Sequence, residues 1–174
     1  MINVGGGRTL TVEDAGPPGG FPVLVHCGGG SRHIDPAAIR QARRYGLRLF
    51  SYDRPAYGGS TPMPGRTIAD CAADVRAIAD DLGISRAAVW GFSGGGPYAL
   101  ATAALLPDRV AAVCVLAPLG PYGASGLDFL HGMDDSYREE VRLFFDDRAA
   151  AREKFRSEAA EMHARLSRPE NWLS

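Results

Sequence analysis

The sequence predicts an α/β fold in which a mostly parallel, doubly wound sheet is covered by helices on both faces. Short apolar segments with the composition of buried strands recur along the chain. Segments with helical periodicity separate them, and strands that alternate with helices form βαβ crossovers and a largely parallel sheet. The strand-like segments are residues 22–25, 47–52, 87–90 and 110–116.

The N-terminal part supplies the first two predicted strands. Apolar and polar residues alternate over residues 8–15, which predicts a half-exposed strand. The prolines and glycines of residues 16–20 then predict a turn. Residues 22–25 are continuously apolar, as in a strand covered on both faces, and they lead into the glycine-rich loop 26–31.

A helix and a further strand follow this glycine loop. The helix is predicted over residues 35–45, because Asp35 suits the N-cap and Pro36 suits the first helical position. Residues 47–52 form the next predicted strand, which ends in the loop 53–60.

A second helix is predicted after the proline-containing turn at residues 62–64. Thr67 and Asp70 have the spacing of a capping box, and Gly83 supplies the stop signal. The apolar stripe of this helix consists of Ile68, Cys71, Val75, Ile78 and Leu82. The last predicted core elements are the strand 87–90, the helix 98–106 and the strand 110–116.

The character of the sequence changes beyond residue 120. From about Leu127 the chain is predicted to be helical, and many Arg and Glu residues in 148–167 indicate a solvated face. We therefore expect a core over residues 1–120 and a helical segment over residues 121–174. The apolar residues expected to anchor the helical segment are Phe129, Tyr137, Phe144, Phe145, Phe155, Met162 and Trp172.

Length and composition are those of an ordinary globular protein. The chain has 174 residues, enough to bury a good core, with 45% hydrophobic and 22% charged residues. Its formal net charge of −1 does not point to nucleic acid or to an anionic membrane surface. The N-terminus lacks the apolar region of a signal peptide, and no apolar run has membrane-spanning length. We therefore expect a cytoplasmic protein.

The strongest motif is Gly91-x-Ser93-x-Gly95, which lies between a predicted strand and a predicted helix. A serine on a sharp strand-to-helix turn has strained backbone angles, and small residues two before and two after it relieve the crowding. The helix that follows offers free N–H groups and a positive dipole end where an oxyanion would form. The pattern in this context predicts a nucleophile elbow with Ser93 as the nucleophile.

Three segments together resemble the α/β-hydrolase superfamily, in particular its esterase, proline-iminopeptidase-like and haloperoxidase-like serine hydrolases. His26-Cys27-Gly28-Gly29 is similar to the family's His-Gly oxyanion loop, and residues 52–58 are similar to its Asp-Arg-x-Gly-x-Gly loop. The elbow is the third segment, and the resemblance covers residues 8 to 120. Cys27 and Ala56 stand where the family usually has glycine, so we expect loop adjustment rather than loss of the site.

The resemblance implies acyl transfer on an ester, amide or N-terminal peptide bond through an acyl-enzyme on Ser93. It also implies an oxyanion hole formed by the backbone N–H groups of Gly28 and Gly94. Serine rather than aspartate at the elbow disfavours the halide-releasing and epoxide-opening branches of the family. The expected partner is a small ester, amide or peptide substrate, and no cofactor or metal is predicted.

The acid and the histidine of the family's triad come after the helical cap, on later strands. This chain is expected to be the N-terminal portion, with its sheet ending after about the sixth strand and residues 121–174 beginning the cap. Asp128, His131 and His163 follow Ser93 but fall in the expected cap, so we do not assign them to the triad. A complementary chain or a C-terminal half would then supply the missing groups.

Several other residues near the motifs have simpler structural interpretations. His26, Asp53 and Arg54 are expected to tie down their loops. Cys27 has no elbow and no paired histidine in sequence, so we interpret it as a small buried hydrophobic residue. Cys27, Cys71 and Cys114 are odd in number and lack C-x-x-C spacing, which argues against a disulfide framework or a zinc site.

Three other interpretations compete with a hydrolase. Gly94-x-Gly96-x-x-Ala99 fits a dinucleotide fingerprint, but residues 117–120 lack the acidic residue that would hold a ribose, so we reject it. The alternatives that stay open are a non-catalytic member that binds a small ligand, and an interaction module that completes its sheet with a partner chain.

Overall fold

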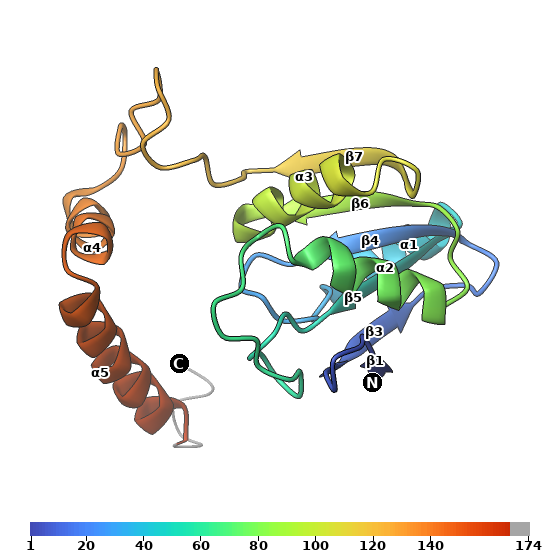
Figure 1. Ribbon diagram of the computed structural model, residues 1–174, viewed down its shortest axis with the longest axis horizontal. Coiled ribbons are helices and arrows are strands. Elements are labelled where there is room, and N and C mark those ends of the chain that lie inside the picture. Colours follow the sequence, from blue (N-terminus) through green and yellow to red (C-terminus); the bar gives the residue numbers. More distant parts are fainter. Residues whose placement is uncertain (168–174) are drawn as a thin grey trace. The chain divides into compact units, whose positions relative to one another are not determined.

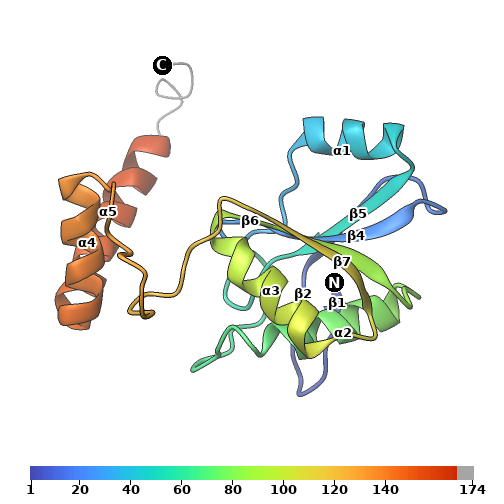
Figure 2. The same cartoon turned by 90° about the horizontal axis from the view of Figure 1, so that it is seen from above.

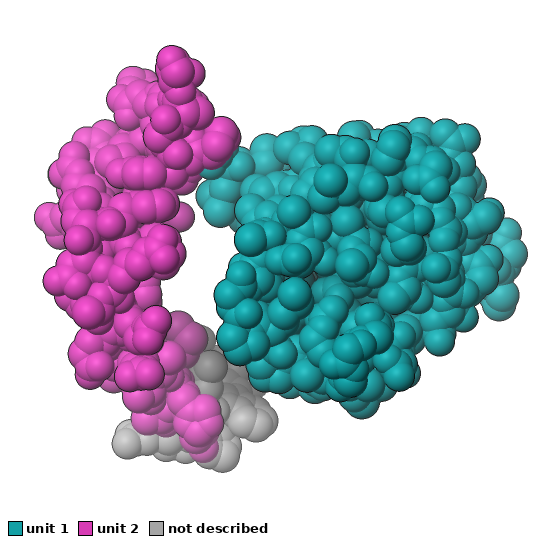
Figure 3. All heavy atoms as spheres, in the orientation of Figure 1, with its two compact units in different colours: residues 1–120 teal, residues 121–174 magenta. Residues whose placement is uncertain are grey.

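The chain divides into two compact units, Met1–Gly120 and Pro121–Ser174, which Figure 3 colours separately. The computed structural model describes residues 1–167. The first unit contains the sheets and three α-helices, and the second contains two helices.

The main sheet of the first unit has five strands, of which all but one are parallel. β3 is antiparallel to β5, and the other neighbouring pairs are parallel. The predicted mostly parallel sheet is therefore confirmed (Figure 1). In spatial order the strands are β3 (Val12–Ala15), β5 (Leu47–Tyr52), β4 (Phe21–His26), β6 (Ala87–Phe92) and β7 (Val110–Leu116).

Helices cover both faces of this sheet, which confirms the doubly wound arrangement. Figure 2 shows α1 (Pro36–Arg44) on one face, and α2 (Cys71–Asp81) and α3 (Gly96–Leu105) on the other. Alternate strand residues supply the two cores, because successive side chains point to opposite faces. Leu24 belongs to the cluster with α2 and α3, whereas its neighbour Val23 belongs to the cluster with α1.

Helix caps determine where the predicted helices begin. The Asp35 carboxylate accepts a hydrogen bond from the Ala37 amide at 2.6 Å, and α1 begins at Pro36 as predicted. Asp70 accepts from the Thr67 amide and hydroxyl at 2.6 and 2.8 Å, so the expected Thr67–Asp70 interaction is present. It closes a turn before the helix, and α2 begins only at Cys71.

The strand predicted over residues 8–15 is interrupted at Thr11. The Thr11 amide donates to the Ser60 hydroxyl at 3.0 Å, and its carbonyl accepts from the Asp53 amide at 2.9 Å. These bonds to another loop separate β2 (Thr9–Leu10) from β3. β2 pairs instead with β1 (Ile2–Asn3) in a small antiparallel sheet that the sequence did not predict.

The second unit contains α4 (Asp135–Asp146) and α5 (Arg148–Leu166). α4 begins later than the expected Leu127, because the Asp134 carboxylate caps it by accepting from the Tyr137 amide at 2.9 Å. Asp147 caps α5 in the same way. Among the described helices of the chain, none combines the length and the hydropathy needed to cross a bilayer.

The apolar residues of the second unit form local aromatic contacts rather than a deep core. The Tyr122 and Phe145 rings stack with their centroids 3.7 Å apart, and Phe129 packs edge-on against Tyr122. The anchors predicted for this unit are largely exposed among its described residues, with Phe155 at 40% and Met162 at 55%. Trp172, predicted as an anchor, lies outside the described residues.

Two isoleucines of the predicted α2 stripe provide a test of the fold. Ile78 is 0% exposed in the core, whereas Ile68 lies before the helix and is 43% exposed. We expect Ile78→Ala to lower the free energy of unfolding by about 2–5 kcal/mol, because it removes buried methyl groups and leaves a cavity. The control Ile68→Ala should change it by less than about 0.5 kcal/mol. Denaturant titration measures both, and equal losses would contradict the helix boundary described here.

Candidate active site

The order of the strands fixes one place where loops from two strands meet. Along the chain the strands run from β4 outward to β5 and then return to the other side of β4 with β6. Such a switch point opens a crevice at the carboxyl ends of the parallel strands. His26 pairs in register with Gly91, so the residues that follow, Gly28 and Ser93, emerge at the same edge.

Ser93 occupies the sharp turn that the sequence predicted. Its φ is 50°, in the left-handed region that non-glycine residues rarely adopt, and it opens a short 3₁₀ turn that leads into α3. Two other described non-glycine residues have positive φ, Ala56 at 73° and Ala117 at 47°. Each follows the carboxyl end of a strand, so backbone strain gathers along this edge of the sheet.

The flanking glycines are required by close approaches of the backbone. A Cβ on Gly91 would lie 2.7 Å from the Ala99 Cβ and from the Gly95 oxygen. A Cβ on Gly95 would collide with the His26 carbonyl oxygen. The spacing of the motif therefore reflects the packing of the turn against α3 on one side and against β4 on the other.

The structure brings Gly28, Ser93 and Gly94 together. A Cβ built on Gly28 would lie 3.1 Å from the Ser93 Cβ and 3.5 Å from its Oγ. A Cβ on Gly94 would lie 2.8 Å from the Gly28 oxygen. The two loops therefore touch through glycine backbone, and the amino end of α3 follows directly.

His26 is buried beneath the elbow and bound within the fold. The Thr102 hydroxyl donates to the Tyr98 carbonyl at 2.8 Å, so it accepts from His26 Nε2, which lies 3.0 Å away. Burial, and secondarily the charge of Arg54, lower the pKa of His26 to about 3. The ring is therefore neutral near pH 7, and these contacts support its structural interpretation.

No base is paired with Ser93 inside the first unit, all of which is described. Its two histidines are His26 and His33, and the side chain of His33 is 79% exposed, with its Nδ1 3.9 Å from a Glu13 carboxylate oxygen. Neither histidine bonds to the Ser93 hydroxyl. In the second unit, His163 Nδ1 lies 3.5 Å from the Ser167 hydroxyl.

Cys27 lies beside Gly28 but is not set up as a nucleophile. Its thiol donates to the His33 carbonyl at 3.2 Å and packs against the apolar cluster of α1. Burial raises the pKa of the Cys27 thiol, with a smaller opposing effect of Arg54, so the thiol stays protonated near neutral pH. These contacts support its interpretation as a packed apolar side chain.

Asp53 and Arg54 hold their own loop, as expected, because their carbonyls accept from the Ser60 hydroxyl and the Tyr57 amide. Their side chains also hold the neighbouring loop, which the sequence did not predict. The buried Asp53 carboxylate accepts from the Arg32 amide at 2.7 Å and from Arg32 Nη1 at 2.6 Å. Arg54 Nη2 donates to the Gly28 carbonyl at 2.9 Å. Sequence spacing carried no signal for Arg32, because the partnership depends on the adjacency of β4 and β5.

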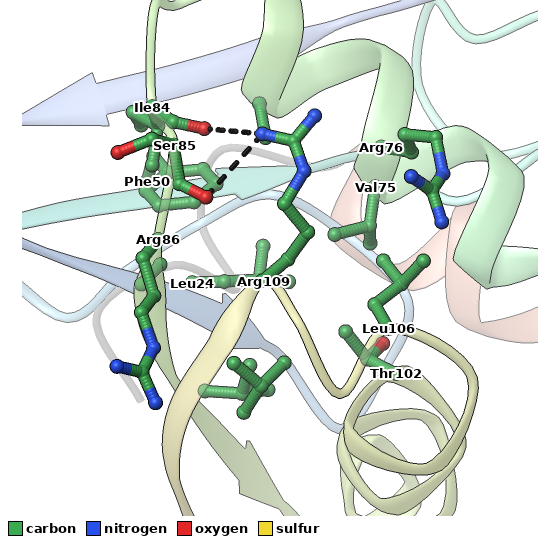
Figure 4. A pocket seen from close by; sticks show the side chains of 14 residues that line it. Leu24, Phe50, Val75, Arg76, Ile84, Ser85, Arg86, Thr102, Leu106 and Arg109 are labelled. Atoms are coloured by element: carbon green, nitrogen blue, oxygen red, sulfur yellow. Dashed lines mark hydrogen bonds between the residues drawn. The ribbon is translucent and has the colours of Figure 1, made fainter.

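Other parts of the described chain offer less for chemistry. Among residues 1–167, no three His, Cys, Asp or Glu side chains gather as a metal site requires. The pocket in Figure 4 lies at the opposite, amino ends of β6 and β7 and is lined mainly by apolar side chains. There Arg109 Nη1 donates to the carbonyls of Ile84 at 3.0 Å and Ser85 at 3.4 Å.

The sequence matches the profile of one protein family and resembles several known proteins. Residues 23–170 match the profile of the family described as "alpha/beta hydrolase fold". A dihydrolipoyllysine-residue acetyltransferase component of the acetoin cleaving system of Pseudomonas putida is 33% identical over 132 residues, which are 73% of this chain and 35% of that protein. A probable proline iminopeptidase of Streptomyces coelicolor is 35% identical over 122 residues, 63% of this chain and 36% of that protein. The chain thus spans about a third of the length of these curated relatives.

A solved structure agrees with the fold. The enol-lactonase from Burkholderia xenovorans LB400 superposes with a TM-score of 0.58 and is 25% identical. The match covers 65% of this chain and 45% of the enol-lactonase chain.

A first prediction for the site concerns the glycine that faces β4. Gly95→Ala should lower the free energy of unfolding by at least about 2 kcal/mol, because the new methyl group collides with the His26 carbonyl oxygen. Gly29→Ala is the matched control, since nothing lies within 4 Å of its Cβ position. Thermal or denaturant unfolding compares the two variants. A stable Gly95→Ala chain would show that β4 and the elbow are further apart than described.

A second prediction follows from the neutral state of buried His26. Between pH 6.5 and about 3 the unfolded chain binds more protons at this ring than the folded chain does. The free energy of unfolding should therefore fall as the pH is lowered through this window, by up to about 1.4 kcal/mol per pH unit from this group.

The variant His26→Gln removes this titration and should show a shallower pH dependence, measured by denaturant titration at several pH values. His33→Gln, which changes an exposed histidine, is the matched control and should keep the original slope. An unchanged slope in His26→Gln would contradict the burial of a neutral ring.

Proposed function

Because the chain belongs to the alpha/beta hydrolase family, we propose that it supplies the nucleophile and the oxyanion hole of a serine hydrolase. The single observation that carries this proposal is the geometry of Ser93. It has a left-handed φ of 50° at the carboxyl end of a central strand, in contact with Gly28 of the neighbouring loop. Strain of this kind is tolerated where a side chain must be held at a functional position.

In the proposed reaction, Ser93 Oγ attacks the carbonyl carbon of an ester, amide or N-terminal peptide bond and gives up its proton to a base. The carbonyl oxygen becomes an oxyanion, which the N–H groups of Gly28 and Gly94 stabilise together with the positive end of α3. The base then returns this proton to the leaving oxygen or nitrogen, the bond from the carbonyl carbon to the leaving group breaks, and the neutral alcohol or amine departs while the acyl group stays on Ser93. Water hydrolyses this ester and restores the serine.

The base and its acid partner are proposed to lie outside the first unit. His26 is bonded to Thr102 and His33 is exposed near Glu13, so neither is available to Ser93. The matched relatives extend well beyond the segment that they share with this chain. We propose that the second unit begins a helical cap, and that a complementary segment or chain provides the histidine and the acid.

The substrate class rests on the relatives and on the identity of the nucleophile. An enol-lactonase and a probable proline iminopeptidase support a small ester or an N-terminal peptide bond as the target. A serine nucleophile suits acyl transfer to water in both cases.

A second candidate function is non-catalytic binding of a small ligand at the same edge. The observation that favours it is the absence, within the first unit, of any histidine bonded to Ser93. The elbow would then have only a structural role, and the amides proposed for the oxyanion hole would donate hydrogen bonds to the ligand.

A fluorophosphonate probe separates the two functions. We expect the intact protein, in which the segment or chain with the histidine and the acid accompanies this chain, to be labelled at Ser93, because only an activated serine reacts readily with this electrophile. Mass spectrometry of the modified peptide identifies the labelled residue. Ser93→Ala should abolish labelling. Ser85→Ala changes an exposed serine before β6 and should label as the unaltered chain does.

Absence of labelling from the well-folded intact protein, with the complementary segment or chain present, would contradict the hydrolase proposal and favour ligand binding. Labelling that survives Ser93→Ala would place the reactive serine elsewhere.

A further inference from the structure

The loop after β4 contains a tight turn that sets the direction of one amide. The Gly30 amide donates to the Cys27 carbonyl at 3.3 Å, which closes a turn over residues 27–30. The Cys27 carbonyl and the Gly28 N–H belong to the same trans peptide, so they point in opposite directions. The Gly28 N–H therefore points away from the interior of the turn. The position of this N–H depends on the contacts that hold the turn in place.

Arg54 holds this turn at two points. Its Nη2 donates to the Gly28 carbonyl at 2.9 Å, and its backbone amide donates to the Gly30 carbonyl, also at 2.9 Å. Gly30 also packs closely on this residue, because a Cβ there would lie 3.0 Å from Arg54 Nη2 and 2.8 Å from the Tyr57 ring. The side chain and the backbone of one residue thus fix both ends of the Gly28–Gly30 segment.

The burial of Arg54 is not explained by ion pairing. Its side chain is only 7% exposed, and among residues 1–167 it forms no salt bridge. Its Nε and Nη1 atoms are buried without a hydrogen-bond partner. The guanidinium lies over the Tyr98 ring, 4.3 Å from its centroid, which offsets part of the desolvation.

A buried cation with two unpartnered donors reduces the stability of a fold, so another role should account for its place. The contacts of Arg54 converge on the loop that carries Gly28, at the edge where Ser93 emerges.

We propose that Arg54 is a positioning residue that fixes the Gly28 amide of the oxyanion hole. This inference rests on the proposed function, since it assigns a role within the same site. Arg54 itself contacts the carbonyl of Gly28 and not the reacting atoms. Its loss frees the peptide between Gly28 and Gly29, and through the Gly28 Cα it loosens the adjoining Cys27–Gly28 peptide that carries the donor N–H. An oxyanion donor that is no longer preorganised stabilises the transition state less.

The test replaces the guanidinium in the intact protein, with the segment or chain that supplies the histidine and the acid present, and measures two quantities. Arg54→Met keeps the length and apolar stem of the side chain but removes its donors. Arg54→Lys keeps one charged donor without the planar fork. The control Arg109→Met removes a guanidinium that also bonds to backbone carbonyls, but at the opposite ends of the strands. The measurements are the rate constant for fluorophosphonate labelling of Ser93 and deuterium exchange of the peptide covering residues 27–32.

We expect Arg54→Met to slow labelling about 10- to 100-fold per folded molecule. Amide exchange over residues 27–32 should rise at least tenfold in the same variant, and Arg54→Lys should lie between it and the unaltered chain. Arg109→Met should change neither quantity by more than about twofold, although it lowers stability.

Unchanged exchange over residues 27–32 in both Arg54 variants would overturn the inference, as would an equal effect of Arg109→Met. Normal labelling by both Arg54 variants would overturn it as well. If neither the unaltered chain nor any variant is labelled, the hydrolase proposal fails. A dependence of loop exchange on Arg54 in that case still supports its role in fixing the Gly28 amide.

Discussion

The architecture of the first unit depends on the close contact between the backbone after β6 and the backbone at the end of β4. Gly95 lies so near the His26 carbonyl that no side chain fits between them, and Gly28 lies against the Ser93 side chain. Because glycine backbone makes both contacts, the adjacency of the two parallel strands sets the site directly. The α2 and α3 side of the sheet then packs around these contacts, and His26 completes the packing beneath them.

Much of this arrangement follows from local sequence rules. Caps, apolar runs and glycine stops predicted α1, β4, β5 and β7 to within a residue or two, since those signals act over a few neighbouring positions. The elbow motif was recognisable because the strain at Ser93 demands small residues at fixed spacing.

The features that sequence reasoning missed depend on contacts between distant segments. Thr11 leaves the expected strand because it bonds to Ser60 and Asp53 on another loop. Arg54 reaches Gly28 and Asp53 reaches Arg32 only because β5 lies beside β4, which no spacing along the chain reveals. In the second unit, α4 begins at Asp135 because the Asp134 carboxylate caps it, although the composition is already helical from about Leu127.

Three non-glycine residues with left-handed backbone angles lie along the carboxyl edge of the sheet, so conformational strain is concentrated there. Ala56, Ser93 and Ala117 each hold the backbone in a conformation that costs about 1–3 kcal/mol, whereas the amino ends of β6 and β7 are braced by Arg109 and apolar side chains. The strain at these three residues should therefore lower the local stability of the loops at the carboxyl edge. Engineering a more heat-resistant chain should begin at Ala56, where glycine would relieve the backbone without removing the serine hydroxyl.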